Sequence, residues 1–172
     1  MRKLIKSLIF LILITASTTS FSYNSDPRIF IAELVGDATK TLSDKNISIA
    51  DKNKKIKDIA LENVDINALS LYTLGGIRKT LDQDTLKKYK KIFEKYFLKS
   101  LISRLTEYSN QTFEVVSVNK KSENTTIVTS RIVKSSSQPE IKIDWRIYTK
   151  DPAKPLIRDL IVEGLSLAKT QK

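Results

Sequence analysis

The chain has 172 residues, contains neither cysteine nor histidine, and has a formal net charge of +11 at pH 7. Without these residue types it has no disulfide, no Ser-His or Cys-His nucleophile and few ways to bind zinc. Packing must therefore hold the fold together. Glycine-rich phosphate loops are also missing, since the only Gly-Gly pair, at 75–76, has no lysine at the required spacing.

Residues 1–22 have the pattern of a secretory signal peptide. Arg2, Lys3 and Lys6 precede the apolar stretch 8–14, and small polar residues follow. The stretch is shorter than the roughly 20 apolar residues of a membrane-spanning helix. We expect cleavage after Ser22, with a retained N-terminal anchor as the alternative. Residues 23–172 would then form a single domain, and losing the three basic residues would lower the formal charge from +11 to +8.

The first half of this domain predicts helices. Asp26-Pro27 is a helix cap followed by proline at the first helical position, and apolar residues then recur three and four apart. Gly75 would end a short helix by adopting a left-handed conformation. The predicted helices cover 27–43, a lysine-rich surface segment at 48–62, and 66–74.

The longest predicted helix runs from Asp82 or Asp84 to Tyr108. Leu86, Tyr89, Phe93, Phe97 and Leu101 fall on one side of it, while most lysines fall elsewhere. This helix has an aromatic inner face.

After Asn110 the hydrophobic period changes from 3.6 to 2 and β-branched residues become frequent. Short polar links favour an antiparallel meander of four strands. In the third strand Ile141, Ile143, Trp145 and Ile147 share one face, and polar residues share the other. The predicted strands cover 112–119, 125–133, 141–149 and 156–167.

The fourth strand changes the parity of its apolar residues. Leu160 and Val162 occupy even positions, but Leu165 and Leu167 occupy odd ones. A β-bulge at Gly164 would repair the register and bend the strand. We therefore predict an α+β fold in which N-terminal helices pack on a strongly curved four-stranded antiparallel sheet, with an apolar cavity between them.

Three segments resemble the MlaC family of periplasmic phospholipid-binding proteins, also called toluene-tolerance or ABC-transporter auxiliary proteins. They are VDINALSLYTLG at 64–75, KKYKKIFEKYFLKSLISRLTEY at 87–108 and DLIVEGLSL at 159–167. The last is the most specific, because it keeps the family's Asp, Glu-Gly, aliphatic and Ser pattern. The resemblance covers nearly all of residues 23–172.

The sequence departs from the family pattern in three places. After Gly75 the family usually has a basic residue, two aromatics and another basic residue, and only Lys79 matches in type. The tryptophan that commonly precedes the Asp159 motif is replaced by Pro155-Leu156-Ile157. The family's C-terminal helix is expected to be missing, which would leave part of the sheet or cavity uncovered.

The resemblance implies a carrier without covalent chemistry. It would shuttle phospholipid between an outer-membrane lipoprotein complex and the MCE-domain subunit of an inner-membrane ABC transporter, and so maintain outer-membrane lipid asymmetry. We expect a periplasmic monomer that needs no cofactor or metal and holds phospholipid as cargo. The predicted lipid-binding residues are Leu74, Phe93, Phe97, Leu101, Ile143, Trp145, Ile147, Val162 and Leu165.

Arg78, Lys79, Arg131 and Arg146 are predicted to contact a lipid headgroup or a docking partner, because cations at a cavity mouth attract phosphate and acidic surfaces. The net positive charge also favours weak peripheral contact with anionic bilayers. For each cation the alternative is a solvated surface charge. For the apolar residues the alternative is ordinary core packing, since a filled and a hollow core have the same sequence pattern.

Two other functions compete with the carrier. The positive charge suits a nucleic-acid-binding module, but the lysines are dispersed, no recognition motif stands out, and residues 1–22 have the pattern of an export signal. The second alternative is a small-molecule-binding protein or enzyme that uses Asp144 or Asp159 as a base. The strand alternation places Asp144 on the solvated face, which weakens that hypothesis.

Overall fold

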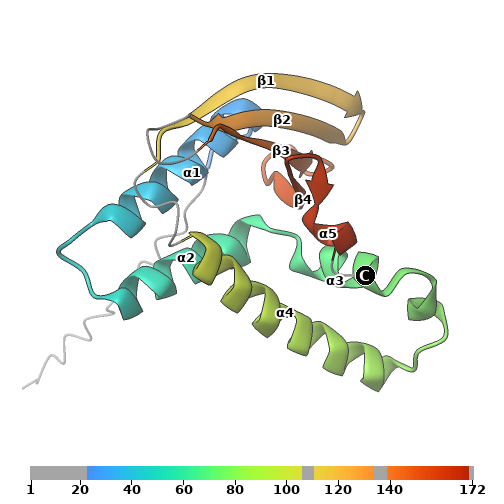
Figure 1. The fold of residues 1–172 in the computed structure, drawn as a ribbon. Helices are drawn as coiled ribbons and strands as arrows, with labels where there is room; N and C mark the ends of the chain where they lie inside the picture. The colour runs from blue at the N-terminus through green and yellow to red at the C-terminus, as the bar shows by residue number, and fades with distance from the viewer. Residues whose placement is uncertain (1–22, 106–110, 134–138, 171–172) are drawn as a thin grey trace, which may run out of the picture.

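A computed structural model describes residues 23–105, 111–133 and 139–170. Helices make up the first half of the described chain, and strands followed by one short helix make up the second, which confirms the predicted α+β class (Figure 1). The elements are α1 (Pro27–Ser43), α2 (Ile49–Asn63), α3 (Ile66–Leu74), the 3-10 helix η1 (Gly75–Lys79), α4 (Gln83–Leu105), β1 (Phe113–Ser122), β2 (Thr125–Ile132), β3 (Ile141–Tyr148), β4 (Leu156–Val162), β5 (Leu165–Ser166) and α5 (Leu167–Thr170).

The helix boundaries follow from side-chain caps. Asp26 Oδ1 accepts a hydrogen bond from the backbone N–H of Arg28 over 2.9 Å, and the side chains of Ser48 and Asp65 cap α2 and α3 in the same manner. Gly75 has φ 57° at the end of α3, a conformation that a side chain would disfavour. The predicted end of the long helix, residues 106–108, lies outside the described residues.

The sheet has the order β1-β2-β3-β4-β5, and all neighbouring strands are antiparallel. This confirms the meander predicted for the first four strands. Trp145 lies opposite Val128 of β2 and Leu160 of β4. The odd-numbered side chains of β3 therefore face the protein interior, as the alternation predicted.

The predicted single strand over 156–167 and its bulge are wrong. Glu163 and Gly164 form a two-residue turn with φ 48° and 79°, and the chain reverses so that Leu165 pairs with Val162. Positive φ at both central residues is the geometry of the type I′ turn that suits tight hairpins. A two-residue hairpin changes the parity of the apolar residues just as a bulge would, so the sequence pattern alone fits both structures.

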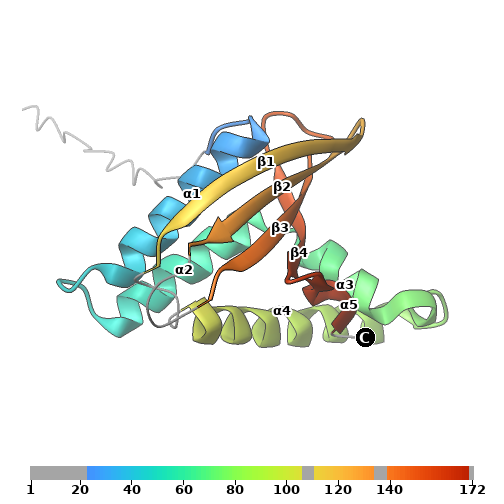
Figure 2. The same ribbon diagram turned by 45° about the horizontal axis from the view of Figure 1, so that its top comes forward.

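The predicted strong curvature is also wrong, because Gly164 lies in the turn between β4 and β5 and does not bend a continuous strand. The sheet is neither closed nor strongly curled (Figure 2). Its register irregularities lie elsewhere, at two places in β1 and beside Arg146 and Ile147 of β3.

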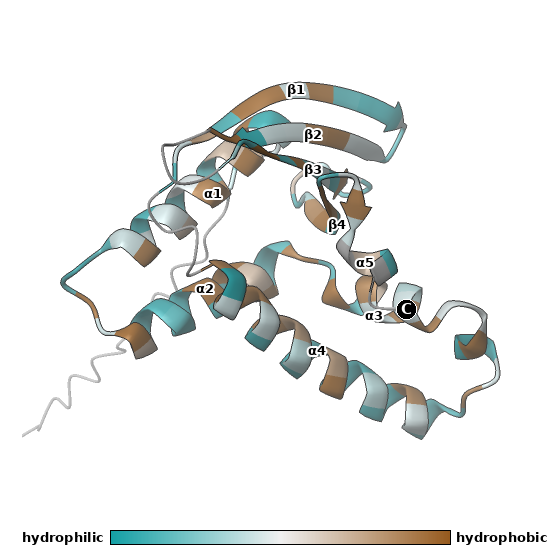
Figure 3. Cartoon of the chain, in the orientation of Figure 1, coloured by the Kyte–Doolittle hydropathy of each residue, from teal (hydrophilic) through white to brown (hydrophobic). Residues whose placement is uncertain are grey.

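The helices lie on one side of the sheet (Figures 1 and 2). One core cluster joins α1, α2 and the sheet, with Phe30, Ile31 and Ile147 almost completely buried. A second cluster joins α2, α3, α4 and α5 around Phe93 and Leu98. Apolar residues recur in bands along these helices (Figure 3). In the part of the chain that the structure describes, no helix has both the length and the apolar character needed to span a membrane.

Candidate functional site

An apolar pocket of about 270 Å³ lies between the helices and the sheet. Three helices contribute aliphatic and aromatic side chains to its wall, and every strand from β1 to β4 adds at least one more. We call this site the apolar pocket. Its apolar lining is Leu34, Val35, Ala38 and Leu42 of α1, Ile56, Ile59 and Ala60 of α2 with Val64 at the end of that helix, Phe97, Leu101 and Leu105 of α4, and the strand residues Phe113, Ile132, Ile141, Ile143, Trp145, Ile157, Leu160 and Val162.

Trp145 is fixed in the wall of the apolar pocket by a polar contact on its indole ring. Its Nε1 donates a hydrogen bond to Ser130 Oγ over 2.8 Å, and Ser130 is completely buried. Phe113 meets the indole edge-on, with ring centroids 6.2 Å apart. The indole therefore has a satisfied N–H and presents apolar surface to the pocket.

The polar residues of the lining are few. They are Thr39 of α1, Arg104 in the last turn of α4 and Gln111 just before β1. Arg104 is exposed, so this part of the lining borders solvent. None of the three was predicted from the sequence. Arg104 could have been, because it lies one helical turn after Leu101, where a cation would be near the end of the apolar face.

A wider groove of about 730 Å³ runs outside, between α1 and β1. Val35, Thr39, Gln111 and Phe113 line both the groove and the apolar pocket, so the two spaces adjoin. Two cations, Arg28 and Lys40, line the groove but not the apolar pocket. The Arg28 guanidinium donates a hydrogen bond from Nη2 to the Val115 carbonyl over 2.9 Å.

The predicted lipid-binding residues occupy several environments. Phe97, Leu101, Ile143, Trp145 and Val162 line the apolar pocket. Phe93 and Ile147 are buried in the two core clusters. Leu74 is half-buried at the end of α3, and Leu165 is exposed just after the β4–β5 turn.

The predicted headgroup or docking cations do not line the apolar pocket. Arg78 and Lys79 are exposed in η1, and the Arg78 guanidinium donates to the Leu71 carbonyl over 3.2 Å. Arg146 is exposed on the outer face of β3.

Arg131 is held by two carboxylates on the outer face of the sheet. Its Nη2 lies 2.9 Å from Glu114 Oε2, and its Nη1 lies 3.3 Å from Glu140 Oε2. The hydrogen bonds that the Arg131 guanidinium donates to Glu114, together with the charge of that carboxylate, raise the pKa of Arg131 above its ordinary value. Both acids already satisfy part of its hydrogen-bonding capacity.

The two carboxylates considered as catalytic bases have local partners. Thr129 Oγ1 donates to Asp144 Oδ1 over 2.6 Å, and Lys142 Nζ lies 3.5 Å from Asp144 Oδ2. Asp159 is buried and accepts from the Ser166 hydroxyl and the Ala168 backbone N–H. Among the described residues, no group of three or more acidic side chains could hold a metal ion.

Comparison with known proteins identifies the family. The model of the family described as MlaC protein matches residues 32–172. The chain belongs to the MlaC family. This confirms the resemblance seen in the sequence. A search of curated proteins returned no match.

The fold of this MlaC family member is similar to that of a solved protein from Ralstonia solanacearum. That structure is described as a phospholipid-binding protein in complex with a phospholipid. It matches with a TM-score of 0.66 and 16% identity, over 82% of this chain and 80% of the other. At this identity the similarity supports a shared fold.

Proposed function

We propose that this protein binds a phospholipid through its acyl chains in the apolar pocket and carries it between membranes. The observation behind the proposal is the lining: apolar side chains make up nearly all of it, and the polar residues are confined to Thr39, Arg104 and Gln111. An apolar concavity with a few polar groups is typical of a small-molecule site. The phospholipid bound by the Ralstonia protein of the same fold adds support.

The proposed cargo explains why the wall is so apolar. Each buried methylene contributes about 0.8 kcal/mol, so an acyl chain gains most from a site without unpaired polar groups. The satisfied indole N–H of Trp145 fits this requirement. The headgroup would lie beside Arg104 and Gln111, where a guanidinium can pair with phosphate.

Loading requires the apolar pocket to enlarge. Its volume of about 270 Å³ is below the range of about 300–1,000 Å³ for ligand sites. Two acyl chains would therefore displace wall side chains or move α4 away from the sheet. The adjoining groove between α1 and β1 offers a direction for this expansion.

The wider role is that of a carrier rather than an enzyme. We propose that residues 1–22 direct export to the periplasm, where the protein would exchange lipid with an outer-membrane lipoprotein complex and an inner-membrane transporter subunit of the MCE type. Arg78, Lys79, Arg131 and Arg146 would serve partner docking, since they lie away from the apolar pocket. The positions of Asp144 and Asp159 in local hydrogen bonds give no support to a catalytic role.

A transfer assay tests carriage. Donor vesicles contain a self-quenched fluorescent phospholipid, acceptor vesicles contain none, and the protein is added in substoichiometric amount. The account predicts dequenching that rises with protein concentration and continues for many lipids per protein. Dequenching no faster than with an equal amount of heat-denatured protein would contradict the proposed carriage.

A further inference from the structure

Helix α4 has a second face that the apolar pocket does not use. Lys88, Ile92, Lys95, Tyr96 and Lys99 recur at helical spacing, and all five are exposed. We call this set the α4 stripe. Ile92 and Tyr96 keep 66% and 56% of their surface in solvent, which is high for residues of this size.

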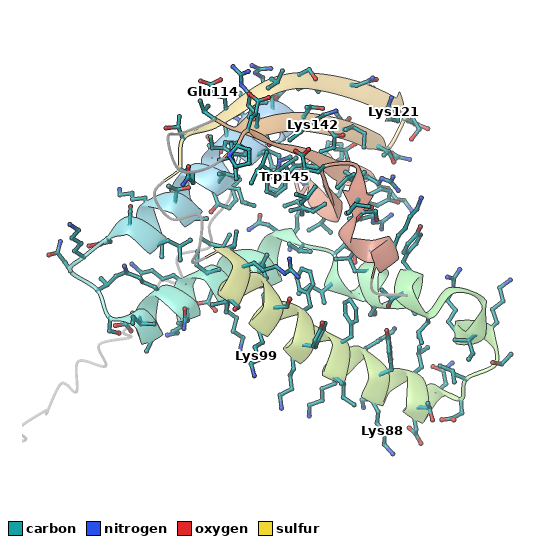
Figure 4. The ribbon with its side chains drawn as sticks, in the orientation of Figure 1. Lys88, Lys99, Glu114, Lys121, Lys142 and Trp145 are labelled. Carbon is teal, nitrogen blue, oxygen red and sulfur yellow. The ribbon has the colours of Figure 1, made fainter. Side chains whose placement is uncertain are left out.

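The α4 stripe points away from the rest of the protein. Lys88 and Lys99 extend to the same side of α4, opposite the sheet (Figure 4). Phe93, on another side of the helix, is buried in the second core cluster, and Phe97 lines the apolar pocket. The same helix thus forms part of the pocket wall and part of the outer surface.

The charge of the α4 stripe has one sign. The acidic residues of the described α4 are Asp84, in the first turn, and Glu94. Glu94 lies roughly 140° around the helix from the middle of the stripe. Asp84 precedes Lys88 by one turn and is at the end of the stripe. Three lysines therefore surround two apolar side chains with no acid among them.

We propose that the α4 stripe docks this protein on an anionic lipid surface. Lysine stems can bury their methylenes beside Ile92 while the ammonium groups reach phosphate, and tyrosine is favoured at the boundary between headgroups and acyl chains. A protein partner fits less well, because lysine is depleted in protein interfaces and two apolar side chains are a small centre for one. The docking does not require cargo in the apolar pocket.

Vesicle sedimentation tests this docking. The full chain is exported and processed in a bacterial host, the mass of the mature form is verified, and the protein is mixed with vesicles of phosphatidylcholine alone or of phosphatidylcholine and phosphatidylglycerol in equal parts. Binding should require phosphatidylglycerol and weaken as salt is added. Absence of binding to the anionic vesicles at low salt would overturn the proposal.

Two variants locate the contact. Lys88→Gln/Lys95→Gln/Lys99→Gln should reduce the partition coefficient by about tenfold or more, since each lysine near an anionic surface contributes roughly a fivefold factor. The control Lys57→Gln/Lys120→Gln/Lys121→Gln removes the same charge from exposed positions on α2 and β1 and should reduce it much less. Equal losses in both variants would show that net charge alone drives adsorption, and would overturn the assignment to α4.

The apolar part of the contact has its own readout. Tyr96→Trp should show a blue shift of its added fluorescence on anionic vesicles, whereas Ile49→Trp, at another exposed site, should not. Neither vesicle sedimentation nor tryptophan fluorescence detects bound cargo. If the α4 stripe fails to bind vesicles, the proposed lipid carriage is therefore still tested separately, by the transfer assay. No shift for Tyr96→Trp on vesicles that sediment the protein would overturn the apolar contact.

Discussion

The Ser166 hydroxyl donates a hydrogen bond to Asp159 Oδ2 over 2.7 Å, and both side chains are more than nine-tenths buried. Ser166 Oγ also accepts from the Lys169 backbone N–H over 3.1 Å, and Asp159 Oδ1 accepts from the Ala168 N–H over 3.2 Å. These bonds tie the start of α5 to β4. The Asp and Ser of the sequence motif at 159–167 thus stabilise the end of the described fold.

Removing this link should destabilise the protein. Ser166→Ala leaves Asp159 without one of its donors in a buried site, which costs about 1–3 kcal/mol of unfolding free energy. Urea denaturation followed by circular dichroism measures the loss. Ser122→Ala, at an exposed position at the end of β1, should change stability by less than about 0.5 kcal/mol. Equal midpoints for Ser166→Ala and the unchanged protein would refute the structural role of the link.

Two glycines should respond to alanine with opposite signs. A Cβ added at Gly36 of α1 or at Gly164 would meet no atom within 4 Å, so space does not decide the outcome. Gly36 is inside a helix, where alanine is favoured by about 1 kcal/mol. Gly164 has φ 79°, where a Cβ costs roughly 1–2 kcal/mol. Thermal unfolding should show a higher Tm for Gly36→Ala and a lower one for Gly164→Ala; shifts of the same sign would contradict the turn geometry.

The start of α4 should give stability that depends on pH. Thr85 donates to both carboxylate oxygens of Asp82, from its backbone N–H over 2.8 Å and from its hydroxyl over 2.7 Å. These hydrogen bonds lower the pKa of Asp82 below its ordinary value of 3.8. Because the folded pKa is below the unfolded one, the contribution is fully present above the unfolded value and is lost as the pH falls through the folded pKa.

Variants at Asp82 test this dependence. Asp82→Ala should lower Tm at neutral pH, and its difference from the unchanged protein should shrink as the pH falls below the unfolded value of 3.8. Asp82→Asn keeps an acceptor for the Thr85 N–H but cannot titrate, so it should retain more stability than alanine and lose less in acid. A constant Tm difference across the acid range would be inconsistent with a titrating cap.

The apolar pocket and the β4–β5 turn should differ in their effect on lipid content. Val162 lines the pocket, whereas Leu165, three residues later, is 65% exposed. Val162→Asp should reduce phospholipid recovered by solvent extraction, because a carboxylate among acyl chains is poorly solvated. Trp145→Asp should do the same, and Leu165→Asp should not. Circular dichroism checks that each variant is folded. Full lipid content in a folded Val162→Asp variant would contradict the assignment of the apolar pocket as the lipid site.

Local signals made much of the fold predictable. Asp26 and Gly75 predicted a helix start and a helix end because capping and left-handed turns depend on a few adjacent residues. The alternation of apolar and polar residues in β3 predicted which face of the strand, the one with Trp145, would be buried, since side chains in a strand point to alternate faces. The short elements η1 and α5 were missed because they contain too few residues to show a period.

The remaining errors concern what distant residues do together. The parity change after Val162 fitted both a bulge and a hairpin, and only the pairing of Val162 with Leu165 distinguishes them. Phe93 and Phe97 share the aromatic side of α4 and both pack in the second core cluster, yet only Phe97 also lines the apolar pocket. That difference depends on the packing of α2 and α3 against the helix, which the periodicity of α4 does not contain.

Native mass spectrometry of the processed protein, purified without detergent, tests the central claim most directly. The spectrum is recorded before and after solvent extraction, and the extract is analysed for phospholipid. The account predicts a bound mass equal to that of a diacyl phospholipid, lost on extraction and restored by incubation with phospholipid vesicles. A folded protein that has only the mass of its polypeptide and takes up no lipid from vesicles would contradict the proposed binding site.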